Sequence, residues 1–154
     1  MAGIGALLVG LVVGAAGQAV PVTVKLFLVV VGDAGRSGEE IGCEDSLVAV
    51  DHEVAPTAAP LTATLKDLLS LHDAHYGESG LYNALAPSHL RLTRVRIRHG
   101  VAEIQLSGDL VIGGACDVPR IAAQLVRTVT QFPTVDRADI YVDNQPLANV
   151  LAGM

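Results

Sequence analysis

Polar side chains that could bind a metal ion gather in one short stretch, "LHDAHYGESGLYN", residues 71–83. His72 and His75 are three residues apart, a spacing that on a helix places both imidazoles on one face, where they can share a metal ion. A competing interpretation is electrostatic, because histidines in the last turn of a helix interact favourably with its negative end, and Gly77 offers a C-cap. The second interpretation is favoured. His72 and His75 are kept only as alternative metal ligands, and no metal or cofactor is predicted.

The rest of this stretch suits recognition of a partner better than catalysis. Its polar and aromatic members form a candidate recognition loop, made of Tyr76, Glu78, Ser79, Tyr82 and Asn83. No serine lies in a G-x-S-x-G turn. The neighbouring carboxylates of Glu39–Glu40 and Glu44–Asp45 lie in an acidic loop that lacks the ligand order of an EF-hand. No catalytic residue is predicted, and the protein is not expected to be an enzyme.

The N-terminal segment has the character of an export sequence. Residues 2–17 are apolar and glycine-rich and carry no charge, and Gly17 and Ala19 are spaced as in a cleavage site. No Lys or Arg precedes the apolar run, which departs from the usual signal pattern. Residues 1–19 are therefore expected to be either a signal peptide or an N-terminal membrane anchor. The protein is expected to be extracytoplasmic, either secreted or anchored to the outer face of the cytoplasmic membrane.

Export would decide the oxidation state of the two cysteines. Cys43 in "EEIGCEDS" and Cys116 in "GGACDVPR" both lie among polar and glycine residues typical of loops. An oxidising compartment favours one structural disulfide between them. Neither cysteine belongs to a CxxC, so a zinc or redox motif has no supporting spacing. Two buried thiols, or a functional thiol pair, remain as alternatives.

Composition limits the class of partner. The chain has 154 residues, of which 51% are apolar and 17% charged, enough for one packed domain over residues 20–154. Its net charge of -6 disfavours nucleic acid as a partner, because phosphate recognition needs a concentrated positive surface. With 3% aromatic residues and no Trp, it also has few stacking platforms for single-stranded nucleic acid or carbohydrate.

Three segments outside the central hairpin are predicted to be strands. "PVTVKLFLVV", residues 21–30, is apolar on both parities, as expected for a central strand covered on both sides. "SLVAVDHEV", residues 46–54, is the second. Residues 137–142 alternate, with Ala138, Ile140 and Val142 pointing one way and Arg137, Asp139 and Tyr141 the other.

Two segments have helical periodicity. The first lies within "PTAAPLTATLKDLLSLHDAH", where Thr57 is a plausible N-cap, Pro60 suits the first turn, and the core face is formed by Leu61, Leu65, Leu68 and Leu69. The second, residues 117–132, can be capped by Asp117. One side of it is an apolar stripe, and the other side carries Arg120, Gln124, Arg127 and Gln131.

The stretch "RLTRVRIRHGVAEIQLSG", residues 91–108, is predicted to be a hairpin with a two-residue turn at His99–Gly100. The turn sets the register by opposing Arg98 to Val101, Ile97 to Ala102, Arg96 to Glu103, Val95 to Ile104 and Thr93 to Leu106. Apolar and polar pairs then fall on opposite faces. Arg94, Arg96 and Arg98 form a stripe that is best explained by solvation, with anion recognition as the alternative.

The resulting order is strand, strand, helix, strand, strand, helix, strand. It defines an α+β fold with two helices packed on one mixed or antiparallel sheet. In this order, "VTVKLFLVV", "SLVAVDHEV", "LTATLKDLLS", "GLYNALAPSHLRLTRVRIRHGVAEIQLSG" and "AAQLVRTVTQFPTVDRADIYVDNQPL" resemble the GerMN domain of sporulation and spore germination proteins. The resemblance covers nearly the whole chain after the N-terminal segment.

This resemblance implies a single GerMN-like domain with a fold similar to the ring-building motifs of secretion-type envelope assemblies. It implies a non-catalytic, extracytoplasmic binding or assembly module of the bacterial cell envelope, whose partner is an envelope protein or a cell-wall polymer. Membrane attachment through residues 2–17 and weak self-association are further expectations. The family offers no catalytic residue to transfer. Two alternatives remain: a small metal-binding protein or metal-dependent enzyme using His72 and His75, and a purely structural, disulfide-stabilised envelope domain with no specific ligand.

Overall fold

The structure, a computed structural model, describes residues 19–153, so the predicted signal peptide or anchor at residues 1–19 lies outside the described residues apart from Ala19. None of the described helices is long and apolar enough to cross a membrane. The elements follow in the order β1 (Val22–Val30), β2 (Glu39–Ile41), β3 (Asp45–Val54), α1 (Pro60–Leu69), β4 (His89–Arg98), β5 (Val101–Asp109), α2 (Asp117–Thr130), β6 (Arg137–Val142), β7 (Gln145–Pro146) and α3 (Leu147–Ala152).

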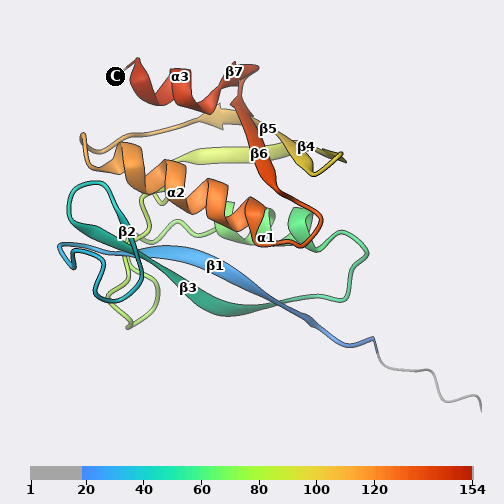
Figure 1. Ribbon diagram of the computed structural model, residues 1–154, viewed down its shortest axis with the longest axis horizontal. Coiled ribbons are helices and arrows are strands. Elements are labelled where there is room, and N and C mark those ends of the chain that lie inside the picture. The colour runs from blue at the N-terminus through green and yellow to red at the C-terminus, as the bar shows by residue number, and fades with distance from the viewer. Residues whose placement is uncertain (1–18, 154) are drawn as a thin grey trace, which may run out of the picture.

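The strands form two sheets with helices between them. One sheet has the order β1-β3-β2 and the other β4-β5-β6-β7. Figure 1 shows α1 and α2 lying between β1 and β3 on one side and β5 and β6 on the other. The predicted α+β class is confirmed. The structure refines the single predicted sheet, because the strands before and after α1 belong to different sheets, and it adds the short elements β2, β7 and α3.

The strand β1 is an edge strand, so the prediction that residues 21–30 form a central strand is wrong. β3 occupies the centre instead. Both parities of β1 are nevertheless apolar, because Leu26 packs in the main core while Phe27 and Val29 pack in a second cluster with Leu47, Ile41, Tyr82 and Ala123. Near the end of the strand, Val29 exchanges two backbone hydrogen bonds with Tyr82, of 2.9 and 2.8 Å. Tyr82 therefore acts there as a strand partner.

Side-chain amides from α2 and from the residue after it bond three more backbone groups on this edge. The amide of Gln131 accepts a hydrogen bond from the Lys25 N–H at 2.7 Å and donates one to the Lys25 carbonyl at 2.8 Å. Gln124 Nε2 donates to the carbonyl of Phe27 at 2.9 Å. Buried backbone groups need such partners, since an unpaired one loses its hydrogen bond to water without replacement. Two glutamines thus replace part of a neighbouring strand.

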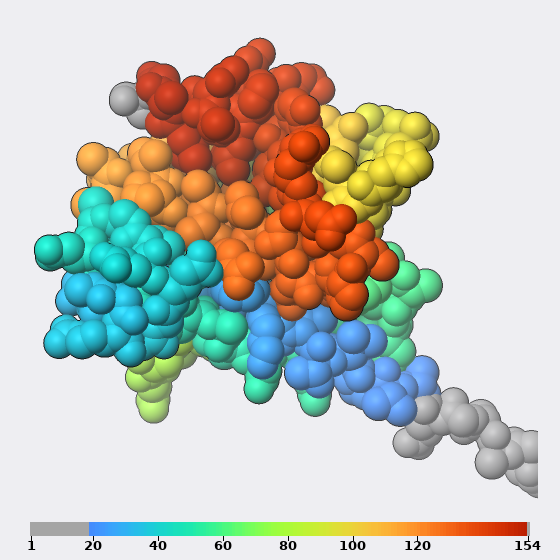
Figure 2. Space-filling view, viewed as in Figure 1, coloured from blue at the N-terminus to red at the C-terminus, as the bar shows by residue number. Residues whose placement is uncertain are grey.

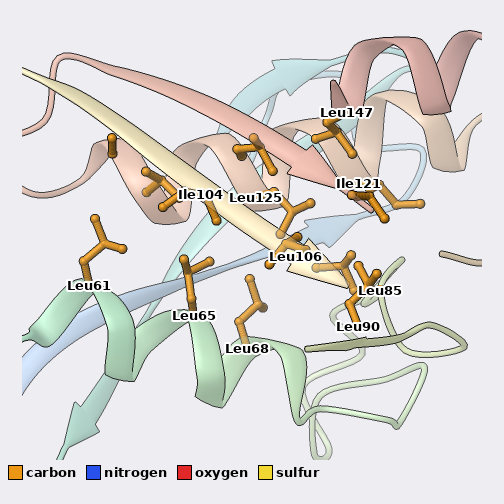
Figure 3. Packing of buried hydrophobic residues seen from close by; sticks show 14 of the residues in the cluster. Leu61, Leu65, Leu68, Leu85, Leu90, Ile104, Leu106, Ile121, Leu125 and Leu147 are labelled. Atoms are coloured by element: carbon orange, nitrogen blue, oxygen red, sulfur yellow. The ribbon is translucent and has the colours of Figure 1, made fainter. Parts of the chain in front are cut away.

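The main core lies between the helices and the inner face of the four-stranded sheet. Figure 3 shows leucines of α1 pointing toward the side chains of β5 and α2. Its fully buried large members are Leu26, Leu65, Leu68, Ile104, Leu106, Ile121, Leu125 and Val129. The predicted core faces of both helices are therefore confirmed. The opposite side of α2, however, also carries buried residues, because it packs on β1.

The hairpin follows the predicted register from its turn to Val95 and then departs from it. His99 and Gly100 both have positive φ angles, of 50° and 77°, as a tight two-residue turn requires. A bulge between Leu92 and Arg94 then pairs Leu92, in place of Thr93, with Leu106. The bulge exists because the apolar residues change parity along β4. It keeps Leu92 on the core face of the sheet.

The two long helices begin close to where the sequence predicts, but with different caps. Pro60 is the first residue of α1, as expected, whereas the N-cap is Ala59 and not Thr57. Thr57 Oγ1 instead accepts a hydrogen bond from the Ala59 N–H at 3.0 Å, inside the preceding turn. Asp117 is the first helical residue of α2. Its carboxylate accepts a hydrogen bond from the Gly113 N–H at 3.1 Å, which holds the preceding loop against the helix.

Replacing Gln124 by Leu should lower the free energy of unfolding by about 3 kcal/mol, because it leaves the Ala84 N–H and the Phe27 carbonyl without these partners and removes one of the two bonds to Asn83 Oδ1. The matched control, Gln131→Leu, should lower it by only about 1 kcal/mol, since water can reach the Lys25 backbone that it uncovers. Urea unfolding followed by circular dichroism measures both. Equal losses for the two variants would contradict the idea that α2 is buried on both sides.

Candidate functional site

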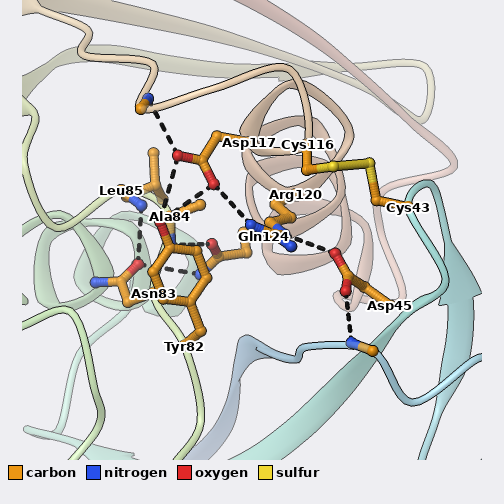
Figure 4. A network of polar contacts seen from close by, with 12 residues as sticks. Cys43, Asp45, Tyr82, Asn83, Ala84, Leu85, Cys116, Asp117, Arg120 and Gln124 are labelled. Carbon is orange, nitrogen blue, oxygen red and sulfur yellow. Dashed lines mark hydrogen bonds and ion pairs between the residues drawn. A yellow bond between two sulfur atoms is a disulfide. The ribbon is translucent and has the colours of Figure 1, made fainter.

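Four polar side chains meet at the N-terminal end of α2, as Figure 4 shows: Asp45 from β3, Asp117 and Arg120 from α2, and Tyr82 from the loop before β4. Arg120 Nε donates a hydrogen bond to Asp45 Oδ2 at 2.6 Å, and Arg120 Nη1 donates to Asp117 Oδ1 at 3.1 Å. The Tyr82 hydroxyl donates to Asp117 Oδ1 at 3.1 Å, and the Arg120 guanidinium lies 5.2 Å from the centre of the Tyr82 ring. Three separate chain segments are joined here.

The charged side chains of the cluster are largely shielded from solvent, and Tyr82 is partly buried. The side chain of Asp45 is completely buried, and those of Asp117 and Arg120 are 6% and 13% exposed. The remaining carboxylate oxygens are also occupied, since Asp45 Oδ1 accepts from the Gly32 N–H at 2.8 Å and Asp117 Oδ2 from the Gly113 N–H at 3.1 Å. Buried charges are stable only when paired and hydrogen-bonded in this way.

The electrostatics of the cluster favour fixed protonation states. Burial by itself raises the pKa of Asp45, but the hydrogen bonds from Arg120 and Gly32 and the charge of Arg120 lower this pKa overall. Burial, and then the negative charge of Asp117, raise the pKa of the Tyr82 hydroxyl. At neutral pH Asp45 is therefore ionised and Tyr82 protonated. Neither group is poised to exchange a proton, as a general acid or base must be.

A second set of hydrogen bonds continues from α2 into the loop before β4. Gln124 Oε1 accepts from the Ala84 N–H at 2.9 Å, and Gln124 Nε2 donates to Asn83 Oδ1 at 3.1 Å. Asn83 in turn donates to the Leu71 carbonyl at 2.9 Å and accepts from the Leu85 N–H at 3.1 Å. The polar groups of both amides thus hold the loop to the helix.

Cys43 and Cys116 are joined by a disulfide in the structure, with their Cα atoms 5.7 Å apart. Cys43 precedes Asp45 by two residues, and Cys116 directly precedes Asp117. The covalent bond and the ion pairs therefore connect the same two segments, as Figure 4 shows. We call the four polar residues, the two amides Asn83 and Gln124, and this disulfide the α2 interlock. Its bonds are all internal, which indicates a structural role.

The structure divides the predicted recognition loop into two parts. Tyr82 and Asn83 belong to the α2 interlock, and Asn83 is almost completely buried. Glu78 and Ser79 are exposed at the tip of the loop. Tyr76 is partly buried against the core, and its carbonyl accepts a hydrogen bond from the Ser79 hydroxyl at 2.5 Å. Only the tip is thus available to a partner.

His72 and His75 do not share a helix, because α1 ends at Leu69. The ring of His72 lies 5.4 Å from that of His89, whereas His75 forms an isolated β-bridge with Tyr82. In residues 19–153 no group of three or more His, Cys, Asp or Glu side chains is arranged to hold a metal ion. The helical spacing that made these histidines metal candidates is therefore absent.

Arg120 and Gln124 are the residues whose roles the sequence analysis missed. Both were predicted on the side of the helix opposite its apolar stripe, with no role assigned, and both are bonded inside the structure. Arg120 and Asp45 are 75 residues apart, so no local pattern connects them. One weak feature of the sequence indicates internal bonding on this side of α2. The side contains amides, which can pair with backbone groups, whereas a solvated side usually carries mixed charges.

The outer face of the four-stranded sheet is the other candidate surface. Buried residues of α1, α2 and α3 share one core cluster with the inner face of this sheet, so the described helices pack on that face. Every outward-pointing residue of β4, β5 and β6 is at least partly exposed. The exposed side chains of β4 on this face include Arg91, Arg94, Arg96 and Arg98.

The arrangement defines an α+β domain of a known fold. It is similar to the first GerMN domain of the sporulation protein GerM from Bacillus subtilis, with 16% identity, a TM-score of 0.55 and coverage of 81% of this chain and 85% of that one. It is also similar to the tandem GerMN domains of that protein, with 14% identity and a TM-score of 0.58. That match covers 86% of this chain and 43% of the tandem chain.

The family model "Germane: Sporulation and spore germination" matches residues 28–148, and the chain belongs to this family. A putative lipoprotein from Clostridium perfringens is a more distant structural match, with 17% identity, a TM-score of 0.45 and coverage of 81% of this chain and 76% of that one. No curated protein matches the chain significantly in sequence. The predicted family is therefore confirmed.

Replacing Asp45 by Asn should lower the free energy of unfolding at pH 7 by about 3 kcal/mol, because it leaves the buried Arg120 with a weaker partner. The pKa of Asp45 is below the ordinary 3.8 in the folded chain, so its stabilising charge is present above about pH 4 and is lost as the pH falls through the lowered pKa. Native and variant stabilities should therefore converge as the pH falls below about 4 and through the lowered pKa of Asp45. Urea unfolding across this pH range measures the stability of the native chain and of the variant. The substitution Glu40→Gln, at an exposed carboxylate, is the control for stability at pH 7. Parallel pH curves would contradict the prediction.

The double variant Cys43→Ser, Cys116→Ser should lose about 4 kcal/mol of unfolding free energy, since the disulfide closes a loop between residues separated by 73 positions. Reduction of the native chain should produce a similar loss and leave the double variant unchanged. Urea unfolding with and without reductant measures both. A native chain that is insensitive to reductant would show that the interlock does not depend on this bond.

Proposed function

We propose that the protein is a non-catalytic binding or assembly module that acts outside the cytoplasmic membrane of a bacterial cell, where it contacts an envelope protein or a cell-wall polymer. One observation carries the proposal. The side chains best suited to chemistry, among them Asp45, Asp117 and the partly buried Tyr82, are bonded within the α2 interlock, whereas residues 19–153 leave a sheet face of mostly charged and polar side chains uncovered. Such a surface suits contact with a partner.

Two features of the chain support a location outside the cytoplasmic membrane. The disulfide between Cys43 and Cys116 is of a kind that persists in oxidising compartments and is rare in the bacterial cytoplasm. The apolar, uncharged residues 2–17 suit either an export signal or a membrane anchor. The family adds support, because its model is described as sporulation and spore germination, processes that remodel the cell envelope.

Partner and oligomeric state remain predictions. The exposed tip of the loop at Glu78 and Ser79 is one contact surface, and the outer sheet face is the larger one. Weak self-association is expected from the similarity to ring-building motifs, and sedimentation velocity over a range of concentrations tests it. The alternative function, metal binding by His72 and His75, is not favoured by any observation in residues 19–153.

Expression of the full-length chain in an export-competent bacterial host tests the compartment. We expect an exported or outer-face product without free thiols before reduction, measured by intact mass before and after reduction and alkylation. The recovered protein should then co-sediment with isolated cell envelopes. A cytoplasmic chain with two free thiols would contradict the proposed location. A correctly exported chain that stays in the supernatant would contradict the proposed binding function.

A further inference from the structure

The strand β4 concentrates positive charge on an acidic protein. Four of the ten lysines and arginines of the chain lie on this strand, although the net charge is -6. All four are exposed. The β4–β5 hairpin that carries them projects at one end of the molecule, in yellow in Figure 2. We call Arg91, Arg94, Arg96 and Arg98 the arginine ladder.

The register places the whole ladder on the outer face of the four-stranded sheet. Each arginine pairs with an outward-pointing residue of β5, namely Arg98 with Val101, Arg96 with Glu103, Arg94 with Gln105 and Arg91 with Ser107. The bulge at Thr93 is essential to this arrangement. Without it, the alternation of side chains would turn Arg91 toward the core.

Most of the ladder is free of internal partners. Arg94 forms an ion pair with Glu103 at 3.2 Å. Arg91, Arg96 and Arg98 form no ion pair with any residue in the described part of the chain. On β6, Arg137 is already paired with Asp139 at 3.1 Å. The unpaired charge therefore lies along the outer strand.

A polar hollow adjoins the ladder. It has a volume of about 460 Å³ and is lined by Thr93, Arg94, Gln105, Leu106, Ser107, Asp143 and Asn144. Charged residues on an edge strand also prevent unwanted strand pairing, and that effect alone accounts for exposed arginines. It does not require a hollow beside them that is lined with hydroxyl and amide groups together with the carboxylate of Asp143. Such groups suit the neutral polar part of a ligand whose charges meet the arginines.

We propose that the arginine ladder and this hollow form a binding site for an extended anionic polymer of the cell envelope. The proposal rests on the proposed binding function and names the chemistry of its partner. Carboxylates or phosphates of the polymer pair with Arg91, Arg96 and Arg98, and a neutral polar unit enters the hollow beside Arg94. Side chains on one face of a strand repeat about every 7 Å, so the ladder matches a charge that recurs along a chain.

Binding of fluorescent poly-L-glutamate and of polyphosphate to the exported protein tests the proposal and separates the two anion chemistries. The variant Arg96→Gln, Arg98→Gln should bind its polymer about tenfold more weakly than the native protein, with a shallower salt dependence. The matched control Arg36→Gln, Arg127→Gln removes the same charge from exposed arginines elsewhere and should bind as the native protein does. Thermal unfolding checks that both variants fold.

Each other outcome overturns the proposal. Equal weakening in both variants would indicate a general effect of net charge, and equal affinity for duplex DNA would indicate an unselective polyanion surface. Absence of binding to either polymer at low salt would exclude the site. Co-sedimentation with cell envelopes separates this result from the proposed function. If the ladder variant still binds envelopes as the native protein does, the binding function stands and the arginine site fails; if the native protein binds no envelope, the function fails.

Discussion

Burial of α2 on two sides is the constraint on which the rest of the structure depends. A helix on the surface of a domain can leave its polar side in water, but α2 lies between two sheets. Most of its buried polar groups therefore find partners inside the protein, the Thr128 hydroxyl being the exception among the described residues. Gln124 satisfies its amide with the backbone of β1 and of the following loop, and Arg120 is neutralised by two carboxylates. The α2 interlock is the result of this requirement.

The same constraint explains how the protein closes its sheet edges. On β1, amides from Gln124 and Gln131 and the backbone of Tyr82 occupy groups that would otherwise seek another strand. On β4 the edge is left open but carries charge and a bulge, which disfavour pairing with another chain. The first edge is closed because α2 lies against it. The β4 edge is free because the described helices pack on the inner face of its sheet. This edge is therefore available for contact with another molecule.

Local periodicity predicts the elements well and their assembly less well. The turn at His99–Gly100 fixes the register of its neighbours, and the shift of apolar residues from even positions before Thr93 to odd positions after it indicates the bulge. Periodicity reveals an apolar face but not which sheet covers it, so two sheets were expected to be one. The ion pair of Arg120 and Asp45 joins distant segments and has no local pattern. Tyr82 and Asn83 have the composition of an exposed loop, and only the tertiary structure shows that they are anchors.

Stability and recognition are located in different parts of the molecule. The α2 interlock joins α2 to β3 and to the loop before β4, and no hydrogen bond or ion pair among the described residues links it to the arginine ladder. Effects of changes at such separate sites are generally additive. A strand also holds its side chains at a fixed spacing, which favours a partner with repeating groups over a small molecule that needs an enclosed pocket. The exposed sheet can therefore change its partner chemistry through single surface residues while the buried interlock keeps the scaffold unchanged.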